Sequence, residues 1–328
     1  MGTNTRMLRA YRFDPQHSER LENWEAACEQ ADSKKLVWVA LSDPSDEEVA
    51  RITGALELGD ELVPLLREPP DRASVADDGQ HVYVTLVAVA GEEDAPALVS
   101  LECVLGENWV VTSHPDEIAV LEEFLERAEG GGEIGVLDAP SFVAVVSEWV
   151  IVSYLRAFEA VEGALEELDA QVISQAPSRD VSAELDRLVE LRLRVGSLRR
   201  ALAPHREVVT SLRHPELDAL STEASGQRFA ELETRVAQAL DAARDTKDSI
   251  FGSFDLLVAR IGQRTNDIMK ILTLGTVILL PATVLAGVMG MNFKVGLFDY
   301  TWLFWAVIAL MLVIAAFVLG AARVREWI

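Results

Sequence analysis

Eight residues between positions 266 and 290 recur at alternating steps of three and four, which places their side chains on one stripe of an α-helix. They are Asn266, Met269, Thr273, Thr276, Leu280, Thr283, Gly287 and Gly290. Most of them are polar or small, whereas the other faces carry large apolar residues such as Ile271, Leu274 and Ile278. In a membrane, such a stripe serves either close packing of helices or a water-filled path.

Two features favour the water-filled path, although threonines alone would favour packing. Asn266 and Met269 extend the stripe beyond the apolar segment, and Asn292 follows just past its other end. An amide at that place would form a hydrogen-bonding ring if several copies of the chain surrounded one axis. Pro281 lies off the stripe, where nearby hydroxyls help to satisfy the backbone of the helix that it interrupts.

The stripe lies in the first of two apolar segments near the end of the sequence. No Asp, Glu, Lys or Arg occurs between Lys270 and Lys294, or between Asp299 and Arg323. Each gap is long enough to cross a hydrocarbon core of about 30 Å at 1.5 Å per residue. Buried helices of a soluble protein rarely supply two such runs in succession. We therefore expect two membrane-spanning helices joined by a tight turn.

The basic residues around these segments predict the orientation of the pair. Arg264 and Lys270 flank the first segment, Arg323 and Arg325 follow the second, and the turn carries Lys294 alone. The positive-inside rule then places the N-terminal region and the C-terminus in the cytoplasm, with the turn outside. Residues 1–35 are polar and mixed in charge, so we expect no signal peptide and a multi-pass protein of the inner cell membrane.

Short strands are predicted upstream of these segments. The runs Leu36–Leu41, His81–Val89, Leu98–Leu105 and Trp109–Thr112 are rich in Val, Leu, Trp and Tyr and are bounded by Asp, Pro, Gly and Asn. A helix from the N-cap Ser45, with Glu48 three residues on, to about Leu58 lies between them. These elements indicate an α/β domain that ends near the glycine run 130–132.

Long charged amphipathic stretches follow this domain. They cover Pro140–Gln175, Val181–Leu212 and the sequence from Glu216 onward, with breaks at Pro177 and Pro215. No strong breaker separates Glu216 from the first span, so one helix of about seventy residues, on the order of 100 Å, is expected. A stalk that connects cytoplasm to membrane would need this reach.

Composition excludes several classes of protein. The 53 acidic and 29 basic residues give a net charge of −24, which argues against nucleic acid as a partner. The two cysteines, Cys28 and Cys103, are too far apart in sequence for a metal knuckle, and the five histidines show no paired spacing. No acid, base and nucleophile set stands out, so we expect no enzyme and no organic cofactor.

The first apolar segment resembles the CorA magnesium channels of the two-span GMN superfamily. The resemblance rests on residues 265–273, on Pro281-Ala282-Thr283 and on the sequence from Ala286 through Gly290-Met291-Asn292 to Phe293. Residues 198–200 and 204–208 are similar to the cytoplasmic helices of that family. The strand that begins at Trp109 is similar to part of the family's N-terminal domain. The similarity extends over nearly the whole chain and is closest in the last sixty residues.

This resemblance implies a homopentameric funnel in which the first span of each subunit lines a pore. Gly290, Met291 and Asn292 would form the outer selectivity filter. Asn266, Met269, Leu272, Thr273, Thr276, Leu280, Thr283 and Gly287 would line the pore and its hydrophobic gate. Neutral amide oxygens suit Mg2+, which gives up its water reluctantly and would be held through that water. The implied function is passive entry of Mg2+, and of Co2+ or Ni2+, into the cytoplasm.

The resemblance also implies regulation by cytoplasmic divalent ions bound between subunits. Asp255 is expected near the neck of the funnel, and Glu231 near an interfacial metal site. Mg2+ would then be both the transported and the regulatory ion.

One departure from the family concerns the outer turn, where acidic residues are usual and this chain has Lys294. A ring of lysines would lower the local cation concentration, and Asp299 would partly offset it. A Zn2+ transporter similar to the ZntB branch therefore remains an alternative, although Met291 favours the magnesium side. A membrane-anchored coiled-coil scaffold or sensor is the alternative from another class.

The predicted architecture is an α+β membrane protein with an N-terminal α/β domain, a bundle of long helices and two C-terminal spans. The expected boundaries are 1–135 for the α/β domain, 136–215 for the long cytoplasmic helices and 216–270 for the stalk helix. The spans are expected at 271–293 and 300–322, with the outer turn at 294–299 and a cytoplasmic tail at 323–328.

Overall fold

The computed structural model describes residues 7–14, 17–29, 35–59, 62–92, 95–129, 138–174, 181–213, 223–291 and 301–324. The chain divides into a first unit, Met1–Ser253, and a second unit, Phe254–Ile328.

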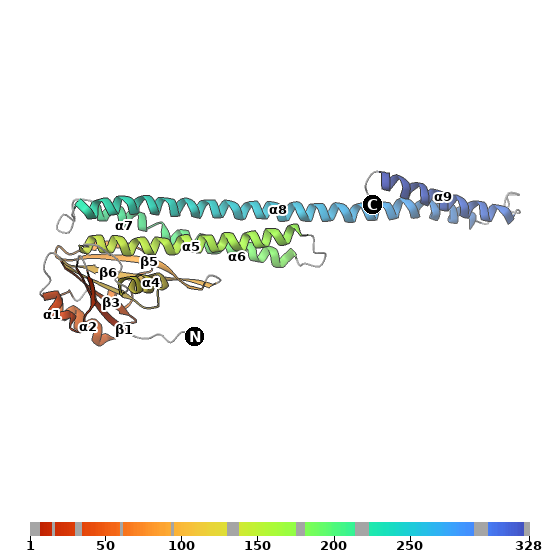
Figure 1. Ribbon diagram of the computed structural model, residues 1–328. Coiled ribbons are helices and arrows are strands. Elements are labelled where there is room, and N and C mark those ends of the chain that lie inside the picture. Colours follow the sequence, from red (N-terminus) through yellow and green to blue (C-terminus); the bar gives the residue numbers. More distant parts are fainter. Residues whose placement is uncertain are drawn as a thin grey trace. The chain divides into compact units, whose positions relative to one another are not determined.

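A seven-stranded sheet organises the first unit (Figure 1). Its strands are β1 (Met7–Asp14), β2 (His17–Arg20), β3 (Leu36–Ser42), β4 (Ser74–Asp77), β5 (Val82–Glu92), β6 (Ala95–Leu105) and β7 (Trp109–His114). Their order is β2-β1-β3-β7-β6-β5-β4, and β3 with β7 is the parallel pair among otherwise antiparallel neighbours. The four predicted strands are confirmed as β3, β5, β6 and β7, whereas β1, β2 and β4 were missed.

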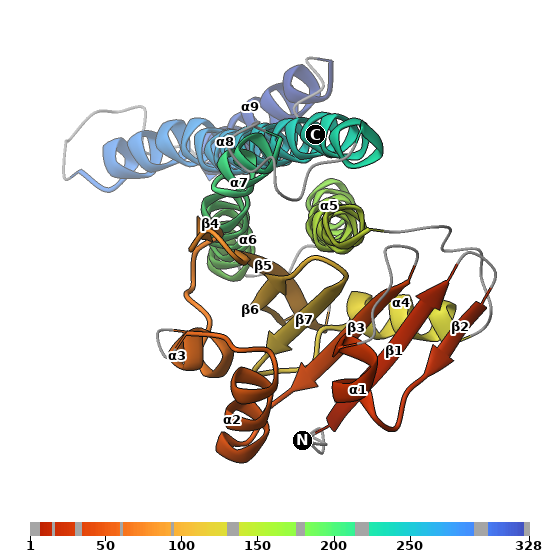
Figure 2. The ribbon, with the colours of Figure 1, turned by 90° about the vertical axis from the view of Figure 1, so that its left-hand side faces the viewer.

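Helices cover both faces of this sheet (Figure 2). On one face lie α1 (Trp24–Glu29), α2 (Asp46–Ala55) and α3 (Leu62–Arg67), with a core that includes Trp24, Val39 and Ile52. The predicted cap of α2 is confirmed, because the Ser45 side chain accepts a hydrogen bond from the Glu48 amide and the Glu48 carboxylate accepts one from the Ser45 amide.

The opposite face is covered by α4 (Ala119–Glu129) and α5 (Ala139–Ile173). An aromatic cluster fills this layer: the rings of Trp38 and Phe142 lie 5.0 Å apart, and those of Trp38 and Phe124 5.5 Å apart. Because every member comes from a different element, the cluster ties β3, α4 and α5 into one core.

Side chains cover the edge of β5 where β4 ends. β4 pairs with β5 as far as Thr85, and beyond it the Val87 amide donates to Nε2 of His205 at 3.1 Å. The Val87 carbonyl accepts from the Tyr154 hydroxyl at 2.8 Å, and the Val89 amide donates to Oγ of Ser153 at 3.0 Å. Helical side chains thus replace a strand as the hydrogen-bonding partner of this edge.

The prediction of one helix over Val181–Leu212 is wrong, since two helices occupy this range. α6 (Val181–Leu202) and α7 (His205–Leu212) are separated at Ala203 and Pro204, because proline has no N–H to continue the helical ladder. The glycine run at 130–132 and the predicted breaks at Pro177 and Pro215 lie outside the described residues.

The long helix predicted from Glu216 is observed as α8 (Glu223–Met289), which has 67 residues. In the first unit it carries a buried seam at alternating steps of three and four: Phe229, Leu232, Val236, Ala239, Ala243, Thr246, Ile250 and Ser253. Thr246 donates to Glu162 of α5 at 2.8 Å, and Ser253 donates to Asp169 at 2.9 Å. Both pairs are 84 residues apart, so α5 and α8 run parallel in fixed register.

Among the described residues, α5, α8 and α9 (Thr301–Val324) are long and apolar enough to cross a membrane. The most apolar window of α5 is 67% buried inside the protein, so α5 is a core helix of the first unit. The corresponding windows of α8 and α9 are 0% buried. These two helices contain the apolar segments delimited by the charge gaps, and they are the candidates for the two predicted spans.

Candidate functional site: the exposed stripe of α8

All eight residues of the predicted stripe lie in the second unit on α8 or in the turn that ends it, and all are exposed. The half-buried positions Leu274, Ile278, Pro281 and Leu285 recur at steps of four, three and four on the opposite side of the helix. An exposed stripe that contains an amide and three hydroxyls is costly to place against lipid. The stripe therefore suits an axis shared by several copies of the chain.

The three threonines of the stripe use their hydroxyl hydrogens within their own helix. Each donates to the carbonyl four residues earlier: Thr273 to Met269 at 2.7 Å, Thr276 to Leu272 at 2.9 Å and Thr283 to Leu279 at 2.8 Å. This local bonding satisfies each hydroxyl without a second helix. The threonines are thus not engaged in helix packing within the subunit.

The stripe ends where α8 ends. The Gly290 amide donates to the Ala286 carbonyl at 3.0 Å, and the Met291 amide donates to the Val288 carbonyl at 3.3 Å. A Cβ at Gly290 would lie only 3.3 Å from the Ala286 oxygen, so a glycine fits this turn best. Asn292, Lys294 and Asp299 lie outside the described residues. Leu272 is exposed but lies beside the stripe, not on it.

An aromatic group at the start of α9 was missed in the sequence. Trp302, Phe304 and Trp305 are all more than half exposed, and the rings of Phe304 and Trp305 lie 5.6 Å apart, edge to face. Tryptophan is enriched where a span leaves the hydrocarbon for the headgroups. In the sequence, the signal for this group is the presence of three aromatic residues within four positions, shortly after the predicted outer turn.

The two proposed regulatory acids are also exposed. Glu231 belongs to the first unit and accepts a hydrogen bond from Gln227 at 3.3 Å, and Asp255 belongs to the second unit. No group of three or more His, Cys, Asp or Glu side chains that could hold a metal ion occurs in the part of the chain that the structure describes.

Glu102 and His205 are among the buried titratable groups of the first unit. Glu102 on β6 is 0% exposed, and its Oε2 accepts from the Thr85 hydroxyl at 2.7 Å. Burial raises the pKa of Glu102 to about 7. His205 is 1% exposed, and burial lowers its pKa to about 4, which favours the neutral ring whose Nε2 accepts from Val87.

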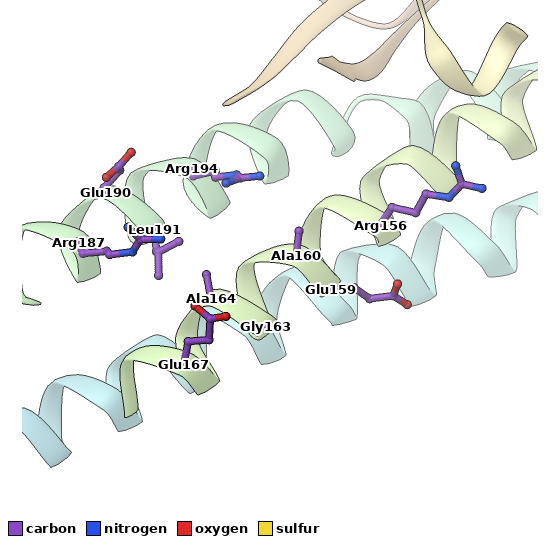
Figure 3. A pocket seen from close by; sticks show the side chains of 10 residues that line it. All are labelled: Arg156, Glu159, Ala160, Gly163, Ala164, Glu167, Arg187, Glu190, Leu191 and Arg194. Carbon is purple, nitrogen blue, oxygen red and sulfur yellow. The ribbon is translucent and has the colours of Figure 1, made fainter. Parts of the chain in front are cut away.

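A hollow of about 780 Å3 lies between α5 and α6 (Figure 3). It exists because Ala160, Gly163 and Ala164 are small, and a Cβ at Gly163 would meet no atom within 4 Å. Three arginines and three glutamates line it, and the guanidinium of Arg156 is already held by both carboxylate oxygens of Glu123 at 2.7 and 3.0 Å. Because positive and negative side chains line the hollow in equal number, it has no excess charge that would favour a cation or an anion.

Comparison with known proteins agrees with the fold. The sequence matches the family "CorA-like Mg2+ transporter protein" over residues 33–320. It is 24% identical over 302 residues to the cobalt/magnesium transport protein CorA of Methanocaldococcus jannaschii. The aligned region covers 90% of this chain and 92% of that protein. It is 26% identical over 176 residues to the protein of the same name from Thermotoga maritima, over 53% of this chain and 49% of the relative.

The structural comparison covers the whole chain. The complete structure of the CorA magnesium transporter from Methanocaldococcus jannaschii superposes with a TM-score of 0.78 at 23% identity, over 99% of both chains. That likeness extends the shared fold from the sheet to the last helix. Because the family match covers most of the sequence, the chain belongs to the CorA-like Mg2+ transporter family.

Proposed function

We propose that this chain is one subunit of a homopentameric divalent-cation channel that moves Mg2+ into the cytoplasm. The observation that carries the proposal is the exposed stripe on α8, from Asn266 to Gly290, in a helix whose most apolar window has no buried residue within the subunit. Five copies around one axis would turn the stripe into a pore lined by side chains of every subunit.

The chemistry of the stripe suits a cation that keeps its water. Mg2+ demands octahedral coordination and dehydrates reluctantly, so neutral oxygens that contact its water are better ligands for passage than carboxylates. The filter assigned to Gly290, Met291 and Asn292 would hold the hydrated ion, and rings of Met269 and Leu280 would close the path by dewetting. No phosphate-binding glycine loop occurs in the sequence, so no nucleotide is proposed.

The membrane potential would supply the driving force. A doubly charged ion gains about 4.6 kcal/mol per 100 mV when it moves to the negative side. With both termini in the cytoplasm, the filter faces outward and the flux is inward. The exposed aromatic residues Trp302, Phe304 and Trp305 support this arrangement, because they would lie at the outer interface of the bilayer.

Cytoplasmic Mg2+ is proposed to close the channel by binding between subunits at acids that include Asp255 and Glu231. Like charges brought together by symmetry favour a divalent ion over an empty site. Current through Asp255→Ala channels at several internal Mg2+ concentrations tests this assignment. If inhibition is unchanged, Asp255 is not a regulatory ligand.

The main test is ion flux into proteoliposomes, with Mg2+, Co2+, Ni2+ and Zn2+ compared for the wild type and Asn292→Ala. We expect Mg2+ flux that Asn292→Ala abolishes or strongly reduces. Ile271→Ala is the matched control, since Ile271 is exposed on the opposite side of α8. A preference for Zn2+ would favour the ZntB-like alternative. Absence of any divalent flux from intact oligomers would favour the membrane-anchored scaffold.

A further inference from the structure

Polar side chains form a line across the face of the sheet that α3 covers. Glu102 of β6 is paired with Thr85 of β5 on one side and with Ser113 of β7 on the other, and Thr85 is paired with Ser74 of β4. Directly opposed residues of adjacent strands place their side chains on the same face. Thr85 is 3% exposed, and Glu102 and Ser113 are 0% exposed. Buried away from water, these groups must find their hydrogen-bond partners within the protein.

The hydrogen bonds along this line run in one direction as far as Glu102. The Ser74 hydroxyl donates to Oγ1 of Thr85 at 3.3 Å, and the Thr85 hydroxyl donates to Oε2 of Glu102 at 2.7 Å. Oε1 of Glu102 has no hydrogen-bond partner among the described residues. Beyond it, the Ser113 hydroxyl donates to the Leu66 carbonyl of α3 at 2.5 Å. The one hydroxyl hydrogen of Ser113 is thus directed away from Glu102.

The Leu66 carbonyl depends on this hydroxyl because α3 ends at two prolines. A helical carbonyl accepts from the amide four residues later in an α-helix, or three residues later in a 3₁₀ turn. Those positions are Pro70 and Pro69, which have no N–H. Leu66 is 0% exposed. Ser113 therefore replaces the missing amide and joins the end of α3 to β7.

The protonation state of Glu102 decides what its Oε1 needs from Ser113. A neutral carboxyl group has a hydrogen to donate, and Oγ of Ser113 can accept it while its own hydrogen stays on Leu66. An ionised carboxylate has no hydrogen and needs donors. A charged acceptor forms the stronger hydrogen bond, so the carboxylate and the Leu66 carbonyl then compete for one hydrogen.

Other titratable groups on the surrounding elements do not take the place of Ser113. The causes of the raised pKa of Glu102 are burial, which raises it, and the hydrogen bond from Thr85, which lowers it. Side chains next to Glu102 and Ser113 in the chain point to the opposite face of the sheet. These neighbours are Cys103 and His114, and the groups with other partners are Tyr83 with Asp78, Arg67 with Asp46 and Arg72 with Glu207.

We propose that the Ser113 hydroxyl is a pH-dependent hydrogen-bond switch, which donates to the Leu66 carbonyl while Glu102 is protonated and turns to the carboxylate when Glu102 is ionised. The pKa of Glu102 is about 7, so the change occurs in the neutral range. Below it, the end of α3 and segment 68–73, which leads to β4, are joined to the sheet. Above it, this hydrogen bond is lost. The switch does not depend on which ion the protein carries.

The test is hydrogen–deuterium exchange of the detergent-solubilised oligomer at pH 6 and pH 8, with each rate divided by the intrinsic rate at that pH. The amides to follow are those of the last turn of α3, where the Glu68 amide donates to the Pro64 carbonyl at 2.9 Å. We expect their protection in the wild type to fall about tenfold at pH 8, as for the loss of one hydrogen bond to a buried carbonyl. Glu102→Gln should keep the protection of pH 6 at both values, because the glutamine amide also donates to Ser113.

Ser113→Ala separates the switch from a general loss of stability on ionisation of Glu102. We expect its α3 amides to have the same low protection at pH 6 and pH 8. Ser113→Cys, whose thiol is a weak donor, should behave in the same way and serves as the second variant if alanine prevents folding. Glu107→Gln is the matched control, since Glu107 is exposed, and it should follow the wild type.

Three results would overturn the proposal. The first is equal protection of the wild type at the two pH values, and the second is a loss in Glu102→Gln as large as that of the wild type. The third is a Ser113 variant that keeps the difference between pH 6 and pH 8, because ionised Glu102 would then act on the whole unit and not through this hydroxyl.

Discussion

Replacement of Glu102 by glutamine is expected to stabilise the protein above neutral pH. The carboxyl group is 0% exposed on β6, its Oε2 accepts one hydrogen bond from Thr85, and its Oε1 has no hydrogen-bond partner among the described residues. Burial raises its pKa from 4.5 to about 7. Ionised Glu102 is therefore disfavoured in the folded state, and the neutral amide of glutamine avoids this cost.

The size and sign of the effect follow from proton linkage. Between pH 4.5 and about 7 the unfolded chain releases the proton of Glu102 and the folded chain keeps it, so the stability of the wild type falls as pH rises through this window. A difference of about 2.5 pKa units corresponds to about 3 kcal/mol at pH 8. At pH 4.5 the carboxyl group of Glu102 and the amide that replaces it are both neutral in the folded state, so the difference in stability between the two proteins disappears.

The assay is thermal unfolding of the detergent-solubilised oligomer from pH 4.5 to 8.5, followed by tryptophan fluorescence. We expect Tm of Glu102→Gln to exceed that of the wild type by about 5 °C or more at pH 8, with the difference shrinking toward pH 4.5. Glu107→Gln is the control, because Glu107 is exposed. If the curves of Glu102→Gln and the wild type run parallel over the whole range, Glu102 does not titrate as a buried group and the reasoning is refuted.

Two further variants, one single and one double, test other buried contacts of the first unit. His205 should contribute stability above pH 6.5 that is lost as pH falls toward 4, because burial lowers its pKa and its neutral Nε2 accepts from the Val87 amide. Unfolding of His205→Gln should depend less on pH in that window, and an unchanged slope would contradict this. Thr246→Val together with Ser253→Ala should lower the free energy of unfolding by about 2 kcal/mol, since Glu162 and Asp169 lose their donors. Thr234→Val changes an exposed position of α8 and should have little effect on the free energy of unfolding. If it lowers that free energy as much as the double variant does, the hydrogen bonds of Thr246 and Ser253 do not stabilise the first unit.

The sequence predicted those parts of the molecule whose pattern is local. The stripe of α8 and the two apolar segments could be found because helical spacing and hydrophobic length are written in consecutive residues. The capping box at Ser45 and Glu48 is equally local. Strands β1 and β2 escaped because charged residues such as Arg9, Arg12 and Glu19 interrupt their apolar pattern, and pairing with β3 decides their state.

Contacts between distant segments could not be predicted. Nothing near Glu102 in the sequence shows that the strand is covered on both sides. Burial raises the pKa of the carboxyl group, and it outweighs the hydrogen bond from Thr85, which lowers that pKa. The two hydrogen bonds between α5 and α8 join residues 84 positions apart, and only packing reveals that Thr246 and Ser253 lie in the seam. Pro204 is visible in the sequence, but the amphipathic pattern of Val181–Leu212 continues across it and predicts a single helix.

The covered edge of β5 bears on how copies of this protein coexist. A strand that exposes unpaired amides and carbonyls offers a template on which a strand of another molecule can add. Subunits gathered at one membrane would meet at high local concentration, where such strand addition leads to aggregation. The side chains of Ser153, Tyr154 and His205 occupy those amides and carbonyls at Val87 and Val89. They would thereby restrict association between sheets and leave assembly to the helices.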